Sequence, residues 1–176
     1  MVTNKTEIRA LERLQSESEL MFSLRRDGRI EVEGVGGKPY RIYKVTVHAK
    51  TYVKTTDGAT PRLSDGPHIF LIEAKVNYPL KSAPIVNFIS DPPAHINVFE
   101  GGQVCIGKWN PRETLASETD RILRVLFIDS KTFNIKSPAD SKLEDFSKSF
   151  EGRAPMNVEA GFKIPCPVFL DEDNAN

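Results

Sequence analysis

The sequence predicts an α+β fold with an N-terminal helix, an antiparallel meander sheet, an irregular segment and then further helices. Two observations carry this prediction. The spacing of apolar residues changes from a helical period of three or four to a strand period of two after Gly28. The strand-like segments are also joined by connections too short for the crossovers that parallel strands require. With 176 residues, the chain has the length of one domain, or of one domain with a tail.

The first predicted element is a helix that stops at Asp27-Gly28, a turn-forming pair. Apolar residues recur along it at spacings of three or four or close to it, with Glu and Arg between them. This pattern is typical of an amphipathic helix that packs on a domain. The apolar positions are Ile8, Leu11, Leu14, Met21 and Phe22.

A β region follows the helix, and alternating polarity marks its strands. Apolar residues alternate with charged residues at 30–32, and the run 41–50 places apolar residues on one face and polar residues on the other. The same alternation continues over 68–76, and a shorter apolar segment covers 85–89. Residues 54–67 contain Asp-Gly pairs and prolines, which predicts a polar loop within the meander.

The second half of the chain begins irregularly. Residues 91–116 are rich in Pro, Gly and Asn, yet they carry enough apolar side chains to argue against disorder. A helix is predicted from Ser117, because the four residues that begin there have the spacing of a capping box. Ser137 is predicted to cap a further short helix that has Pro at its first position. We therefore divide the chain into a domain over 1–150 and a tail over 151–176.

Composition excludes several kinds of partner. Lys plus Arg number 24, as do Asp plus Glu, and a net charge of zero offers no electrostatic case for binding nucleic acid or an anionic membrane. No window approaches the ~20 apolar residues of a transmembrane helix, and the polar N-terminus lacks a signal-peptide core, which predicts a cytoplasmic protein. Two Cys and three His are too few for a disulfide scaffold or a convincing zinc site. The sequence also has no phosphate-binding Gly-rich loop followed by Lys-Ser/Thr, which argues against a nucleotide cofactor.

The irregular segment holds the residues that carry chemistry. Cys105 lies between glycines on a segment that a large partner can approach, and Asn97 lies eight residues upstream. Acyl transfer through a thioester needs such a pair, a nucleophile and a hydrogen-bond donor aimed where the oxyanion develops. A lone Cys is more often a buried structural thiol, so these residue types alone do not establish catalysis.

The same segment resembles the active-site segment of ubiquitin-conjugating enzymes, the family with the UBC fold. That family carries a His-Pro-Asn motif, a catalytic Cys eight residues after the Asn, and a Trp-x-Pro segment before a helix. Here His95, Asn97, Cys105 and Trp109-Asn110-Pro111 stand in that order. The fold expected from the resemblance is UBC-like, in agreement with the α+β element order.

The resemblance extends on both sides of this segment. Tyr78-Pro79 and the segment 83–88 resemble the family's Tyr-Pro and Pro-x-Val-x-Phe strand pair. Residues 134–138 resemble the segment after the second helix, where the family places Asp or Ser near the catalytic Cys. The match covers roughly residues 7–150 in element order.

Three departures from the family pattern stand out. Ile96 replaces the Pro of the His-Pro-Asn motif, and Trp109 follows Cys105 by only four residues, so the loop after the Cys is trimmed. The helix pair at the C-terminus of the family's domain is also shortened. These departures resemble the divergent UBC-fold proteins of bacterial ubiquitin-like conjugation operons, some of which are linked to antiphage defence.

The resemblance implies a role for each motif residue. Cys105 would accept the C-terminal acyl group of a ubiquitin-like protein from a separate adenylating activating enzyme and transfer it to an amine on a target protein. Asn97 would stabilise the oxyanion or brace the loop, and His95 would hold the loop by hydrogen bonding. Trp109 would be a packing anchor for the active-site loop. Ser137 would line the approach of the target lysine, although its role as a helix cap needs no function.

The implied partners are the ubiquitin-like protein, the activating enzyme and the target, with no nucleic acid and no membrane. The arginines of the first helix resemble the family's docking surface for the activating enzyme, although a solvated helix face also explains them. The alternative is a catalytically inactive UBC-fold binding module that scaffolds the ubiquitin-like protein or the activating enzyme. The presence of Cys105 at the motif position argues against that alternative, and Cys166 has no motif and no assigned role.

Overall fold

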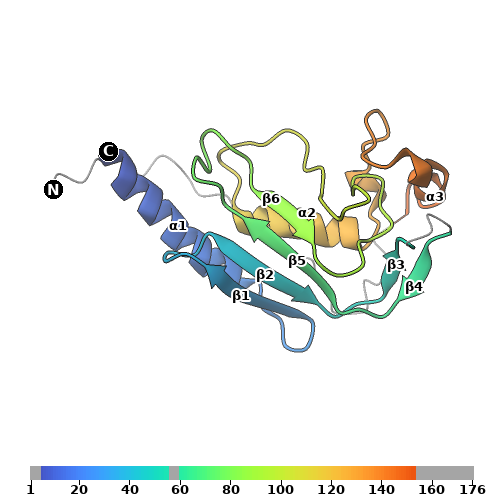
Figure 1. Ribbon diagram of the computed structural model, residues 1–176, viewed down its shortest axis with the longest axis horizontal. Coiled ribbons are helices and arrows are strands. Elements are labelled where there is room, and N and C mark those ends of the chain that lie inside the picture. The colour runs from blue at the N-terminus through green and yellow to red at the C-terminus, as the bar shows by residue number, and fades with distance from the viewer. Residues whose placement is uncertain (1–4, 56–59, 154–176) are drawn as a thin grey trace.

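A computed structural model describes residues 5–55 and 60–153 of the chain, and its element order is the predicted α+β order (Figure 1). One helix precedes a four-stranded sheet, a two-stranded sheet branches from it, and the remaining helices follow. The main elements are α1 (Lys5–Ser23), β1 (Ile30–Gly36), β2 (Ile42–Val47), β3 (Thr51–Val53), β4 (Arg62–Ser64), β5 (His68–Glu73), β6 (Ile85–Phe88), α2 (Leu115–Leu126), the 3-10 turns η1 (Ser130–Thr132) and η2 (Ser141–Leu143), and α3 (Glu144–Lys148).

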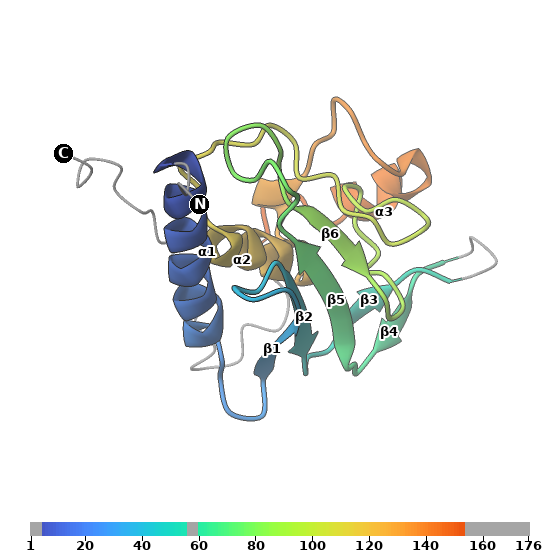
Figure 2. The same ribbon diagram turned by 60° about the vertical axis from the view of Figure 1, so that its left-hand side comes forward.

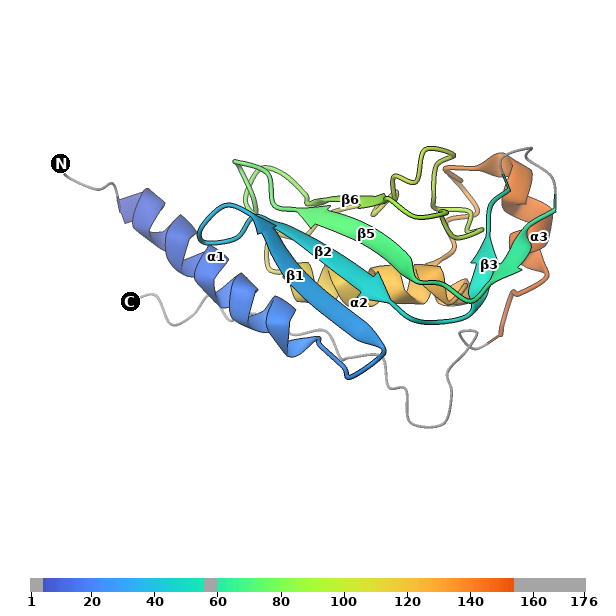
Figure 3. The ribbon, with the colours of Figure 1, turned by 60° about the horizontal axis from the view of Figure 1, so that its bottom comes forward.

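The main sheet is an antiparallel meander with the strand order β1-β2-β5-β6, as the alternation of polarity predicts. Tyr43 and Val45 of β2 pair with Ile72 and Phe70 of β5, and all four side chains are fully buried. Helix α2 covers one face of this sheet, and α1 packs beside α2 near the β1 edge (Figure 2 and Figure 3). The core therefore lies between the sheet and the two long helices, where burial of apolar surface stabilises the domain.

The region between β2 and β5 differs from its prediction. The strand expected to run to Lys50 ends at Val47, and the predicted loop 54–67 contains β4, which pairs with β3. Strands of three residues are too short for a polarity pattern to identify. A tertiary contact places β3 instead. The buried hydroxyl of Thr51 donates to the carbonyl oxygen of Leu126 at the end of α2, 2.5 Å away.

Helix α2 begins two residues before the predicted start. Its N-cap is Thr114, whose side chain accepts a hydrogen bond from the backbone N–H of Ser117 at 2.9 Å. The hydroxyl of Ser117 in turn lies 2.9 Å from the backbone nitrogen of Thr114. The prediction of a capping box that begins at Ser117 is therefore wrong, because Ser117 closes the box rather than opening it.

The predicted cap of the later helix is also wrong. Ser137 is exposed in a bend, and Asp140 caps η2 by accepting a hydrogen bond from the backbone N–H of Lys142 at 3.1 Å. The backbone N–H groups of Ala139 and Asp140 both donate to the carbonyl oxygen of Ile96, at 2.9 and 3.1 Å. The segment after Ser137 thus docks on the irregular segment instead of starting a helix, and α3 begins only at Glu144.

Two further findings concern the described residues alone. Within 5–55 and 60–153, no helix has both the length and the apolarity needed to cross a membrane. Over the same residues, no three His, Cys, Asp or Glu side chains gather in a way that could hold a metal ion. Cys166 and most of the tail lie outside the described residues, so the division into a domain and a tail stays a prediction.

Candidate active site around Cys105

The irregular segment forms a hairpin that places Asn97 opposite Cys105. The backbone N–H of Cys105 donates to the carbonyl oxygen of Asn97 at 2.8 Å, and Val98 pairs with Val104 in an antiparallel bridge. Two residues that face each other across a hairpin keep a fixed separation in sequence. The spacing of eight residues between Asn97 and Cys105 is therefore the register of this hairpin.

The turn of the hairpin depends on Gly102. Its φ is +84°, and a Cβ at this position would lie 2.7 Å from the carbonyl oxygen of Phe88. Only glycine combines this backbone conformation with so close an approach. The N–H of Phe88 donates to the carbonyl oxygen of Gly102 at 2.9 Å. The N–H of Val104 donates to the carbonyl oxygen of Val86 at 3.0 Å. Strand β6 thus aligns the hairpin and, with it, Cys105.

His95 is fully buried and holds the base of the hairpin. Its Nδ1 accepts from the backbone N–H of Asn97 at 3.0 Å, so its Nε2 carries the proton and donates to the hydroxyl of Thr132 at 2.9 Å. That hydroxyl donates onward to the carbonyl oxygen of Asp129 at 2.6 Å. Burial, together with the positive charge of Lys54, lowers the pKa of His95 to about 3. His95 is therefore neutral near pH 7 and has both ring nitrogens engaged in this network.

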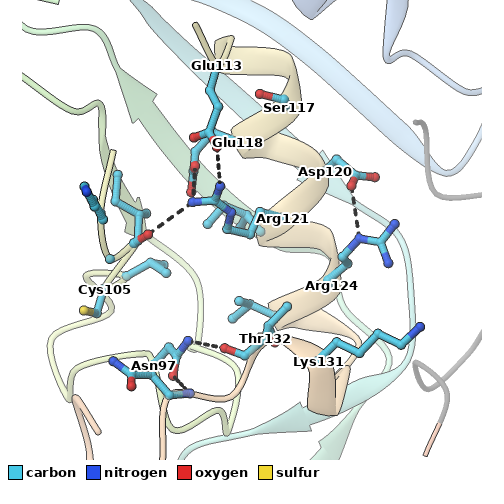
Figure 4. A pocket seen from close by; sticks show the side chains of 17 residues that line it. Asn97, Cys105, Glu113, Ser117, Glu118, Asp120, Arg121, Arg124, Lys131 and Thr132 are labelled. Carbon is cyan, nitrogen blue, oxygen red and sulfur yellow. Dashed lines mark hydrogen bonds and ion pairs between the residues drawn. The ribbon is translucent and has the colours of Figure 1, made fainter. Parts of the chain in front are cut away.

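The side chain of Asn97 connects the hairpin to the segment after α2 (Figure 4). Its Nδ2 donates to the carbonyl oxygen of Thr132 at 2.5 Å, and its Oδ1 accepts from the backbone N–H of Asn134 at 3.0 Å. Both ends of the amide are engaged, so Asn97 braces the loop. The amide nitrogen carries a second N–H in addition to the one that Thr132 accepts.

The structure separates the other two predicted residues. Trp109 donates from Nε1 to the carbonyl oxygen of Pro79 at 2.9 Å, and its ring lies 5.6 Å from that of Tyr78. Trp109 therefore connects the chain between Cys105 and α2 to the loop before β6 through a hydrogen bond and a ring contact. Ser137 is exposed and is not among the residues that line the cavity beside Cys105.

Cys105 lies on the wall of a cavity of about 600 Å³ between residues 104–108 and α2. Its thiol is free and partly exposed. Acidic and basic side chains line this cavity together with apolar side chains of the same segment and of α2. The charged side chains that line it are Lys108, Glu113, Glu118, Asp120, Arg121, Arg124 and Lys131.

Sequence reasoning missed a group of three charged side chains at this cavity. The guanidinium of Arg121 donates to the carbonyl oxygen of Ile106 and to Glu113 Oε1, each at 3.1 Å, and lies 3.0 Å from Glu118 Oε2 (Figure 4). The signal in the sequence was the spacing of three between Glu118 and Arg121, which suits an ion pair on a helix. Such pairs usually face solvent, whereas the side chain of Glu118 is fully buried.

Burial of Glu118 predicts a dependence of stability on pH. Burial is the main cause that raises its pKa from 4.5 to about 7, with Arg121 opposing the rise and Glu113 adding to it. The folded protein therefore holds a proton that the unfolded chain releases, and the free energy of unfolding falls as pH rises from 4.5 to about 7. At about 1.4 kcal/mol per pKa unit, the loss is up to about 3 kcal/mol.

The replacement Glu118→Gln removes the titrating group and keeps its shape, so urea unfolding of both proteins between about pH 5 and pH 8 isolates the effect. We expect the wild type to lose stability relative to Glu118→Gln as pH rises through this range. The low pKa of His95 has the opposite sign, because it destabilises the fold as pH falls below 6.5, but it is common to both proteins. A difference that stays constant with pH would contradict the prediction.

Comparison with known proteins agrees with the resemblance in the motifs. The chain is 33% identical over 97 residues to a protein named "Probable ubiquitin-conjugating enzyme E2 W" from Dictyostelium discoideum, a match that covers 52% of this chain. It spans 62% of that relative, which is less than two thirds of its length. A solved structure, the Plasmodium vivax ubiquitin conjugating enzyme E2, has a TM-score of 0.48 and 24% identity, and the match covers 65% of this chain and 98% of that one. No protein-family model matches the chain. The chain is thus similar in sequence to a ubiquitin-conjugating enzyme, which confirms the resemblance that its motifs predict.

Proposed function

We propose that this protein is a ubiquitin-like protein conjugating enzyme that works by transthiolation. Cys105 attacks the thioester that links the carrier protein to an activating enzyme, a new S–C bond forms, and the thiol of the activating enzyme leaves. An amine on a target protein then attacks the new thioester and releases Cys105. ATP is consumed by the activating enzyme, so this chain needs no cofactor for either step.

One observation carries the proposal. A free, partly exposed Cys lies on a hydrogen-bonded hairpin, on the wall of a cavity lined by charged and apolar side chains, at the position of the family's catalytic Cys. A thiol buried among apolar side chains would be inert, whereas this one is open to a large partner. The similarity to a ubiquitin-conjugating enzyme supports the same class of reaction.

The proposal assigns supporting roles around Cys105. Asn97 braces the hairpin through Thr132 and Asn134, and the second N–H of its amide can donate to the oxyanion of the tetrahedral intermediate. His95 serves the same loop as a neutral hydrogen-bonding residue rather than as a base for the thiol. The reaction does not require a base here, because a thioester is already activated toward an amine.

Partners follow from the proposed reaction. The protein takes a ubiquitin-like protein from an adenylating activating enzyme, which we propose docks on α1, and delivers it to a target protein. Ser137 lies on the exposed segment after α2 and remains a proposed contact for the target lysine. A bacterial origin and a role in antiphage defence stay predictions from the departures in the motif.

Loading of the full chain tests the proposal. The protein is incubated with ATP and an adenylating enzyme with its cognate carrier, starting with ubiquitin and continuing with the ubiquitin-like proteins encoded near its gene. We expect one adduct on a non-reducing gel, its loss on addition of dithiothreitol, and a modified peptide that contains Cys105. An adduct that resists dithiothreitol, an adduct on Cys166, or no adduct with any pair would overturn the proposal.

Thiol alkylation separates this function from the alternative of an inactive binding module. The native protein is treated with iodoacetamide, and modification of Cys105 is followed by mass spectrometry, with the unfolded protein as the reference for full reactivity. We expect Cys105 to react in the folded state, because it is partly exposed. Complete protection of Cys105 in the folded protein would favour the binding module.

A further inference from the structure

The backbone on the two sides of Cys105 is held by different contacts. On the preceding side, the hairpin fixes Cys105 through its hydrogen bond to Asn97. On the following side, Gly107 has a φ of +73°, and no atom lies within 4 Å of the place where its Cβ would be, so Gly107 itself makes no side-chain contact at this turn. Three contacts with the rest of the domain reach this side: Ile106 and Trp109 pack against the core, and Trp109 is hydrogen-bonded to Pro79. The one nearest to Cys105 that acts on the backbone comes from Arg121 of α2, which donates to the carbonyl oxygen of Ile106.

The guanidinium of Arg121 is itself held in place. It donates hydrogen bonds to the carbonyl oxygen of Ile106 next to Cys105 and to Glu113 before α2, and it forms an ion pair with Glu118 within α2. A planar guanidinium that meets two acceptors and an ion-pair partner has one orientation, which a flexible ammonium would not reproduce. The backbone of Glu113 is fixed in turn, because its carbonyl oxygen accepts from Arg13 of α1 at 2.6 Å. The side of Cys105 that faces α2 is thus connected to both long helices.

We propose that Arg121 is a positioning residue for the transfer reaction, because it holds the carbonyl group of Ile106 against α2 and so keeps the thioester on Cys105 aligned for the incoming amine. The inference rests on the proposed function. In the step that it serves, the amine nitrogen bonds to the acyl carbon, the carbon–sulfur bond breaks, and the proton of the amine passes through solvent to the sulfur of Cys105. Arg121 touches neither the acyl group nor the amine, and acts through the backbone.

The main test compares Arg121→Met with a matched control, Arg41→Met. Arg41 also donates to a backbone carbonyl, that of Lys75 at 3.2 Å, but it lies away from the cavity. Each protein is loaded with carrier, and discharge to free lysine is measured in a single turnover. We expect Arg121→Met to lower the maximal discharge rate roughly 10- to 100-fold, as small misalignments of reacting groups do, while the half-saturating lysine concentration changes less than about threefold. Arg41→Met should match the wild type.

Two further variants separate positioning from loss of folding. Arg121→Met leaves the buried carboxyl of Glu118 without its ion-pair partner. The double variant Glu118→Gln/Arg121→Met removes that carboxylate as well. We expect it to discharge as slowly as Arg121→Met alone. Arg121→Lys keeps the charge without the planar fork, and we expect a discharge rate between those of the wild type and Arg121→Met. Equal rates for the wild type, Arg121→Met and the double variant would overturn the inference.

Hydrogen exchange gives a readout that does not depend on loading. The N–H of Cys105 is protected by its bond to Asn97, and we expect Arg121→Met, but not Arg41→Met, to speed its exchange in the native protein. Unchanged exchange would overturn the inference even if the wild type loads normally. If the wild type never loads, the proposed function fails. In that case, faster exchange of the Cys105 N–H in Arg121→Met would still show that Arg121 holds this backbone. The role of Arg121 in transfer would be overturned.

Discussion

Cys105→Ser is expected to change the adduct with the carrier from a thioester, which dithiothreitol cleaves, to an ester, which resists dithiothreitol and is cleaved by alkali. Serine replaces sulfur by oxygen at the same place on the hairpin, so the cavity and the partners that it meets are unchanged. An alkoxide forms far less readily than a thiolate, and we expect loading at least about 10²-fold slower than that of the wild type. Non-reducing gels of samples treated with dithiothreitol or alkali before electrophoresis measure both effects.

Cys105→Ala completes this test, because it removes the nucleophile and leaves the fold intact. We expect no adduct at all, whereas Cys166→Ser should load like the wild type, since Cys166 has no place in the motif. A reducible adduct on Cys105→Ala would mean that another group accepts the carrier. A stable ester on Cys105→Ser combined with no adduct on Cys105→Ala would place the acceptor atom at position 105.

Replacing Glu17 by Leu is expected to give the largest loss of stability. The carboxylate of Glu17 is fully buried and accepts three hydrogen bonds, from Arg13 Nε at 2.8 Å, from the hydroxyl of Tyr78 at 2.5 Å and from the backbone N–H of Leu115 at 2.8 Å. A leucine side chain at this position has no acceptor, so all three donors would lose this partner. Breaking such a buried charged group typically costs about 3–5 kcal/mol.

The location of Glu17 gives this loss a structural consequence. Leu115 is the first residue of α2, so Glu17 joins α1 to the helix that carries Arg121. Burial and the adjacent carboxylate of Glu17 also raise the pKa of Tyr78, which keeps its phenol protonated as a donor. We therefore expect a weaker attachment of α2 to α1 in the variant, in addition to the lower free energy of unfolding.

Denaturant unfolding at equilibrium measures the effect, with Glu19→Leu as the control. Glu19 is exposed on the same helix, and its replacement should change stability by less than about 0.5 kcal/mol. If Glu17→Leu does not fold, Tyr78→Phe removes one donor of the same cluster and should cost about 1–2 kcal/mol. A loss below about 1 kcal/mol for a folded Glu17→Leu would contradict the structural role of this cluster.

Most of the candidate site could be predicted because it is local in sequence. Asn97 and Cys105 face each other across one hairpin, and the turn needs Gly102, so a stretch of nine residues contains the whole arrangement. Trp109 follows within the same segment and is hydrogen-bonded to Pro79. These contacts form between residues a few positions apart, where spacing and residue type determine what can meet.

The predictions that were wrong concern helix starts and two short strands. Serine is a residue type expected of a helix cap, but Ser117 lies within α2, whose N-cap is Thr114. The segment after Ser137 is hydrogen-bonded to Ile96 instead of starting a helix there. Strands β3 and β4 were missed because three residues carry no reliable pattern. In each case a contact made by the folded chain outweighs a weak local preference.

The sequence by itself determined the α+β order, the meander and the pairing of Asn97 with Cys105, because periodicity and turn residues act over short separations. Only the tertiary structure decided which distant groups complete the site. These groups meet through hydrogen bonds between residues far apart in the sequence. The separation is 35 residues for Asn97 and Thr132, 15 for Arg121 and Ile106, and 98 for Glu17 and Leu115. Such contacts depend on how the helices and the sheet pack around a shared core. That packing is set by the free energy of the whole domain, and no local sequence pattern encodes it.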